Sequence, residues 1–104
     1  MSADPKMLVP NPTSLGYSSF TRIFYDVATI GLYANLMIFD HQGRRIKQLL
    51  KNASIDSSGS VLWDGVDDSG NSVYAGSYLI LVEVYGLNSP RKILKEVMVV
   101  GFQY

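Results

Sequence analysis

The chain has 104 residues, with nine Lys or Arg and nine Asp or Glu, so its formal net charge at neutral pH is zero. This length suits one domain, and a hydrophobic fraction of 47% argues against disorder. The balanced charge argues against a protein that binds nucleic acid or an anionic membrane surface. The absence of Cys and the presence of one His exclude disulfides, thiol chemistry and metal sites built from Cys or several His side chains.

The first nineteen residues are rich in proline and small polar residues. Pro5, Pro10 and Pro12 disfavour a helix, which predicts an extended lead-in with a turn. We expect residues 1–8 to be an extended lead-in, or a remnant of expression, and residues 9–104 to form the domain. The start lacks the basic and apolar regions of a signal peptide. No run approaches the roughly 18 apolar residues of a membrane helix, so membrane insertion is not predicted.

Beyond residue 19, apolar segments alternate with short runs of turn-forming residues. Strands are predicted in chain order at residues 20–27, 32–39, 44–51, 60–63, 74–85 and 91–100. For residues 45–50, one or two helical turns are an alternative. Strands of this length and spacing predict an all-β fold, an immunoglobulin-like antiparallel β-sandwich of about seven strands.

Alternation along these strands predicts which side chains face the core. The inner positions are Ile23, Tyr25, Val27, Ala34, Leu36, Ile38, Tyr78, Ile80, Val82 and Val84. The opposite positions should meet water, yet many are apolar: Phe24, Tyr33, Met37, Phe39, Leu79, Leu81 and Tyr85. Two explanations remain open. The lead-in or a wrongly assigned strand covers some of them, or they form an interface with a preceding domain or a second copy.

Asp64, Asp67 and Asp68 lie close together before the long predicted strand at 74–85. Carboxylate oxygens are calcium ligands, so these three are weak calcium candidates. The spacing of an EF-hand fails, because the positions eleven residues further on hold Ala75, Tyr78 and Leu79. A hairpin turn, in which Asp side chains accept backbone N–H groups and Gly70 adopts a positive φ, fits better. No metal site is therefore predicted.

No motif for catalysis or cofactor binding is present. His41 lies in a predicted turn, where a solvated histidine is expected rather than a general base, and the chain has no Gly-x-Ser-x-Gly, P-loop or Gly-x-Gly-x-x-Gly motif. We predict no catalytic residue, no cofactor and no enzyme activity. Basic residues at 44–47 and 91–95 are too few for a nucleic-acid surface. Asn52-Ala53-Ser54 is a formal glycosylation sequon, a triplet that is common by chance.

The motifs, taken in chain order, form a more specific pattern. They are Ile38-Phe39-Asp40-x-x-Gly43-Arg44-Arg45-Ile46, Trp63-Asp64-Gly65-x-Asp67-x-x-Gly70, Val73-x-x-Gly76-Ser77-Tyr78 and Lys95-Glu96-Val97-x-Val99. This order resembles the immunoglobulin-like domain of flagellar hook-capping proteins. It resembles more closely the C-terminal domains of secreted Bacteroidetes proteins exported by the type IX system. Pro10-Asn11-Pro12 matches the start of those domains. The resemblance spans residues 9–100.

Each motif residue has a role in keeping the fold. The residues expected in such roles are Gly43, Trp63, Asp64, Gly65, Asp67 and Gly70. Trp63 would cap one end of the core, and Tyr78 would anchor the long strand to it. Gly76 would allow a close approach of the backbone at the start of that strand. The family therefore explains these residues without an active site.

The resemblance implies a non-catalytic C-terminal sorting domain. In that family, outer-membrane export machinery recognises the domain as a folded unit, and a sortase-like protease removes it as the cargo is attached to surface lipopolysaccharide. The positions that match the sorting motifs are Pro10, Asn11, Pro12, Gly76, Tyr78 and Lys95. The resemblance places the protein outside the cell or on its surface, as part of a larger precursor. Its expected partners are the secretion machinery or the preceding domain.

Two other functions remain open. The chain is alternatively a spacer or binding module of a multidomain surface protein, which contacts a glycan or a neighbouring domain through its apolar second face. A third hypothesis is an assembly subunit with weak self-association. The sorting hypothesis predicts a natural protein that ends at or near Tyr104, whereas the spacer hypothesis predicts further domains on either side.

Overall fold

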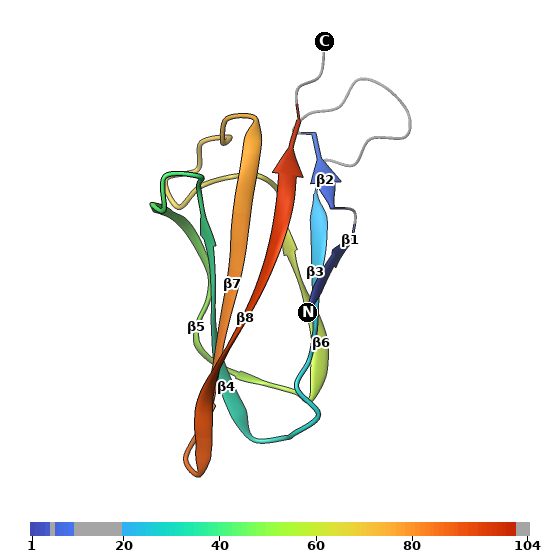
Figure 1. The fold of residues 1–104 in the computed structure, drawn as a ribbon, viewed down its shortest axis with the longest axis vertical. Coiled ribbons are helices and arrows are strands. Elements are labelled where there is room, and N and C mark those ends of the chain that lie inside the picture. The colour runs from blue at the N-terminus through green and yellow to red at the C-terminus, as the bar shows by residue number, and fades with distance from the viewer. Residues whose placement is uncertain (5, 10–19, 102–104) are drawn as a thin grey trace.

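The structure is a computed structural model that describes residues 1–4, 6–9 and 20–101. The described residues form eight β-strands and no helix, and so none that could cross a membrane (Figure 1). The strands are β1 (Ser2–Asp4), β2 (Met7–Leu8), β3 (Thr21–Asp26), β4 (Leu32–Phe39), β5 (Arg45–Ile55), β6 (Ser58–Trp63), β7 (Gly76–Gly86) and β8 (Ser89–Val100).

Two sheets pack face to face. One has three strands in the order β1-β3-β6, and the other has five in the order β2-β8-β7-β4-β5. All neighbouring strands are antiparallel except β2, which runs parallel to β8. The prediction of an all-β, immunoglobulin-like sandwich is confirmed.

The N-terminal residues contribute to both sheets. β1 pairs with β3 in the small sheet, and β2 pairs with β8 in the large one, so the chain changes sheets between Asp4 and Met7. Ala3 is buried in the core. The sequence predicted only an extended lead-in over residues 1–8 and no pairing. Strands of two and three residues are too short to show the alternation by which strands are recognised.

β5 is longer than predicted, because residues 52–55 belong to the strand rather than to a turn. The β4–β5 ladder contains three register shifts, and Asn52 has a positive φ of 46°. Such bulges allow turn-forming residues inside a strand. The helical alternative for residues 45–50 is wrong, since this segment pairs with β4.

The core lies between the two sheets and contains most of the predicted inner side chains. Tyr25 and Val27 are only partly buried at its margin. The largest fully buried side chains are Trp63, Ile23, Leu36, Ile38, Ile80 and Met98. The period of two therefore predicted the buried face of β3, β4 and β7.

Candidate functional site

Trp63 and Tyr78, both predicted to hold the core, meet at one end of the sandwich. Their rings are in edge contact, with centroids 5.7 Å apart. The Nε1–H of Trp63 donates to the carbonyl of Val66 at 3.0 Å, and the Tyr78 hydroxyl donates to the carbonyl of Tyr74 at 2.5 Å. Burial raises the pKa of Tyr78, and the negative charge of Asp40 adds to this shift. Through these two hydrogen bonds, the buried Trp63 and Tyr78 side chains hold both ends of the segment between β6 and β7.

The acidic residues of that segment bind its own backbone. Asp64 Oδ1 accepts the N–H of Val66 at 3.2 Å, and Asp67 Oδ1 accepts the N–H groups of Ser69 and Asn71 at 2.9 and 3.0 Å. Gly65 and Gly70 have φ values of 76° and 88°. This arrangement is a tight turn stabilised by Asp side chains.

Asp68 connects this turn to β5. Its N–H donates to the carbonyl of Ile46 at 3.0 Å, and its Oδ1 accepts the N–H of Gln48 at 3.2 Å. Lys47 Nζ lies 3.9 Å from the same oxygen. Within the described part of the chain, no three His, Cys, Asp or Glu residues are grouped as a metal site would require.

The expected role of Gly76 is wrong. A Cβ atom added at this position would meet no atom within 4 Å, so the backbone makes no close approach there. Gly76 has a φ of 150°, a conformation that residues with a side chain rarely adopt. Glycine is required here by the dihedral angle, which a sequence motif does not distinguish from a steric requirement.

We expect Gly76→Ala to lower the free energy of unfolding by about 2 kcal/mol through backbone strain. Ser77→Ala, at the exposed next position, is the matched control and should change it by less than about 0.5 kcal/mol. Denaturant titration of both variants measures the difference. A Gly76→Ala variant as stable as the parent would show that the strand start tolerates an ordinary φ.

The turn between β4 and β5 is organised by Asp40. Its Oδ1 accepts the N–H groups of Gln42 and Arg44 at 2.9 and 3.0 Å, and its Oδ2 accepts Arg44 Nε at 2.9 Å. Gly43 completes the turn with a φ of 80°. The pKa of Asp40 is lowered, chiefly by the hydrogen bond from the Arg44 backbone N–H, whereas burial acts to raise it. The adjacent His41 is exposed.

This lowered pKa predicts a pH dependence of stability. Because the folded state prefers the ionised carboxylate, the contribution of Asp40 is present above the ordinary value of 3.8 and is lost as the pH falls through the lower folded-state value. In urea titrations from neutral pH down to about pH 2, the stability difference between the parent and Asp40→Asn should shrink only below about pH 4. A difference that is constant with pH would contradict this assignment.

The outer face of the large sheet carries the apolar side chains noted in the sequence. One cross-strand row joins Phe39, Leu79 and Val97, and the next joins Met37, Leu81 and Lys95. Val97 is 57% exposed, whereas Phe39, Leu79 and Leu81 are half-buried by their neighbours. Coverage by the lead-in remains a prediction, because residues 10–19 lie outside the described residues.

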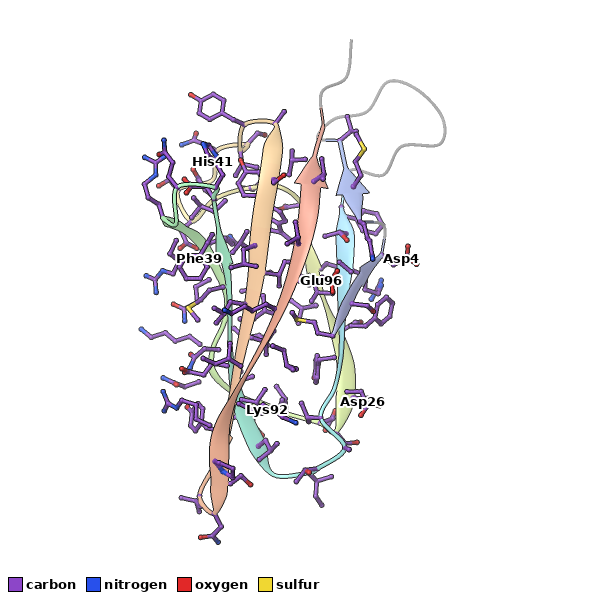
Figure 2. The ribbon with its side chains drawn as sticks, viewed as in Figure 1. Asp4, Asp26, Phe39, His41, Lys92 and Glu96 are labelled. Carbon is purple, nitrogen blue, oxygen red and sulfur yellow. The ribbon has the colours of Figure 1, made fainter. Side chains whose placement is uncertain are left out.

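A shallow hollow of about 420 Å³ opens on this face beside the β4–β5 turn. Phe39, Leu79, Leu81, Val97 and His41 are among the residues that line it. Figure 2 labels Phe39 on β4 and His41 in the turn that follows. Its lining is mostly apolar, and its polar residues include Asp40, His41 and Ser77. The hollow suits an apolar contact better than a reaction on a polar substrate.

The other end of the same face holds a polar network that the sequence motifs did not indicate. Asn35 donates to Glu83 Oε1 and accepts the N–H of Asn52 at 2.8 Å. Glu83 also pairs with Arg91 at 3.1 Å, and the Arg91 guanidinium lies over the ring of Tyr85. Alternation along the strands was nevertheless a signal for this network, because it places the polar residues Asn35 and Glu83 on the same outer face of β4 and β7.

The predicted sorting positions are only partly brought together. Gly76 and Tyr78 start β7 at the Trp63 end, whereas Lys95 is exposed on the outer face of β8, opposite Leu81. Pro10, Asn11 and Pro12 lie outside the described residues. Among the basic residues at 44–47 and 91–95, Arg44 forms an ion pair with Asp40, and Arg91 forms one with Glu83.

No protein-family model and no curated protein sequence matches this chain. Among solved structures, it is similar to PorZ of Porphyromonas gingivalis, described as an essential bacterial surface component of the type IX secretion system. The TM-score is 0.54 and the sequence identity 24%, over 96% of this chain and 11% of the PorZ chain. The likeness therefore concerns the fold, and this chain spans about a tenth of the length of that protein.

Proposed function

We propose that this chain is a non-catalytic sorting and anchoring domain at the C-terminus of a larger secreted surface protein. The type IX secretion machinery would recognise it as a folded unit. The observation that carries the proposal is the gathering of most of the ordered motif residues at one end of the sandwich, with Lys95 apart from them on β8. Trp63 and Tyr78 hold one turn through their hydrogen bonds, Gly76 begins β7 after it, and Asp40 and Gly43 form the neighbouring turn.

The similarity to PorZ supports this proposal at the level of the fold. PorZ is a surface component of a type IX system, and the matched part is a small fraction of its chain. A sandwich of this kind thus occurs as one module within a longer protein of that system. The motif resemblance, which does not depend on PorZ, points to the same system.

The outer face of the large sheet is the surface that we propose the machinery contacts. It offers the hollow lined by Phe39, Leu79 and Val97. Lys95, one of the matched sorting positions, lies in the row beside it. A half-exposed apolar surface beside a positive charge suits recognition by another protein.

Export of a reporter tests the proposal directly. A reporter protein fused ahead of residues 1–104 should reach the surface or the medium of a host with a type IX system. Parallel fusions lacking residues 101–104 test the contribution of the tail. Retention of the reporter in the periplasm with both forms would refute the sorting function.

A matched pair of substitutions tests the contact surface. Val97→Glu, on the outer face of the large sheet, should reduce export about tenfold, which corresponds to a loss of about 1.4 kcal/mol in recognition. Leu62→Glu is the control, because Leu62 is 47% exposed on the other sheet. Equal export of the two folded variants would exclude the outer face as the contact.

A spacer or binding module is the second candidate, favoured by the same apolar face. In that case the preceding domain would cover Phe39, Leu79 and Val97. Val97→Glu would then loosen the contact between the domains and leave export unchanged. Limited proteolysis of the parent protein at the junction before this domain separates the two functions.

A further inference from the structure

The edge of β8 that faces away from β7 is unpaired over most of its length by the described strands. β2 pairs with β8 only at Val99 and Val100, and no other described strand lies hydrogen-bonded on that side of β8. The N–H of Val99 donates to the carbonyl of Lys6 at 2.9 Å, away from β7. Backbone direction alternates along a strand, so the N–H and C=O groups of Val97, Lys95 and Ile93 point to the same open side.

The two edges of the large sheet differ in regularity. β5 pairs with β4 through three register shifts, and Asp68 binds β5 at Ile46 and Gln48. In contrast, β8 pairs with β7 in unbroken register from Gly76 to Val84. Regular, unpaired edges are templates for the addition of another strand, whereas bulges prevent it.

The side chains of β8 are self-complementary about Leu94. In the β7–β8 ladder, Lys92, Leu94 and Glu96 lie opposite Val84, Val82 and Ile80, whose side chains face inward. If two copies of β8 run antiparallel with Leu94 opposite Leu94, then Lys92 of each lies opposite Glu96 of the other. Both pairs are of the non-hydrogen-bonded type, in which side chains approach closely.

We propose that two copies of this chain associate through their β8 edges, in the antiparallel register centred on Leu94. The two five-stranded sheets then form one continuous sheet with a two-fold axis at Leu94, an isologous contact. Lys92 and Glu96 lie along the same strand (Figure 2) and provide two equivalent ion pairs. The only ion pair of Glu96 within the described residues is the long one to Lys6, at 3.9 Å.

Other registers are less favourable. A register centred on Lys95 would place two lysines directly opposite each other, which destabilises a strand pair. A register centred on Ile93 would place Lys92 opposite Leu94 and Glu96 opposite Pro90, so neither charge would have a charged partner. Charge complementarity therefore selects Leu94 as the centre. The association does not depend on an export function, because it needs only the geometry of β8.

Charge reversal in separate copies tests the register. Lys92→Glu and Glu96→Lys each place like charges opposite one another, and each should raise the dissociation constant of the dimer about tenfold. A mixture of the two variants restores both pairs, so sedimentation equilibrium should recover a heterodimer of parental affinity. Lys51→Glu, on the exposed part of β5, is the control and should leave the dimer unchanged.

A cysteine variant tests the centre of the interface without altering charge. The chain has no Cys, so Leu94→Cys introduces a single thiol. Opposite residues in a non-hydrogen-bonded pair have Cα atoms about 4.5 Å apart, within the span of a disulfide. Mild oxidation should therefore link Leu94→Cys copies into covalent dimers and leave Val97→Cys copies unlinked, because Val97 would lie opposite Arg91 of the second copy.

The expected result is a parent dimer with a dissociation constant of about 1 mM or tighter. Three results would overturn the proposal. They are a parent chain that stays monomeric above that concentration, a mixture that associates no better than either charge variant alone, and equal crosslinking of the two cysteine variants. Far-ultraviolet circular dichroism of each variant verifies that it is folded.

Discussion

Replacing Trp63 with Ala should lower the free energy of unfolding by about 4 kcal/mol. The indole is 1% exposed and packs against Tyr78, so truncation leaves a large cavity at one end of the core. It also removes the N–H donor to Val66, which holds the segment between β6 and β7. Since small domains are stable by about 5–15 kcal/mol, this loss is a large part of the total.

Trp63→Phe separates packing from the hydrogen bond. It keeps an aromatic ring in the core and removes the donor, so we expect a smaller loss, about 2 kcal/mol. Equilibrium denaturation followed by far-ultraviolet circular dichroism measures both variants. A loss below about 1 kcal/mol for Trp63→Ala would mean that Trp63 does not hold the core.

Ile80→Ala should cost about 3–4 kcal/mol, the second largest effect, because Ile80 lies at the centre of β7 and is fully buried between the sheets. Its neighbour Leu79 points to the outer face and is half-buried. Leu79→Ala should therefore cost only about 1 kcal/mol. The pair compares two similar deletions on the two faces of one strand.

The contrast between these two variants tests the sandwich itself. Denaturant unfolding of each variant at the same pH gives the two losses directly. If Leu79→Ala were as destabilising as Ile80→Ala, the outer face would be part of a core. The apolar outer row would then be covered in the isolated chain, as the alternative of a covering lead-in requires.

The long strands could be predicted from the sequence because their alternation is clear. Residues 32–39 were predicted within their observed bounds, and the inner positions Leu36, Ile38 and Ile80 are fully buried. Strands of two and three residues give no period, so β1 and β2 were missed. The continuation of β5 past Asn52 was missed because a bulge depends on its partner strand.

The candidate site was less predictable than the fold. Turn chemistry is local, so the positive φ at Gly70 and the Asp67 hydrogen bonds follow from adjacent residues. The network around Asn35 joins residues up to 48 positions apart, so alternation could place Asn35 and Glu83 on an outer face without showing that they meet. The reason for Gly76 was mistaken because a motif marks a glycine without saying whether space or φ requires it.

The apolar outer face of the large sheet appears both in the sequence pattern and in the structure. The sequence indicated that apolar side chains occupy positions that should meet water, and the structure aligns Phe39, Leu79 and Val97 in one row. Their exposure has no role in holding the sandwich together. Under the proposed function, a second protein would recognise this surface, next to the turns at the Trp63 end.

The most direct test of the account is the dependence of export on folding. Reporter fusions carrying the parent domain, Trp63→Phe and Trp63→Ala would be compared for the fraction of reporter at the cell surface, beside the measured stability of each domain. If the machinery recognises a folded unit, surface delivery should fall in step with the folded fraction and be lowest for Trp63→Ala. Delivery of an unfolded Trp63→Ala domain at the parental level would contradict the account.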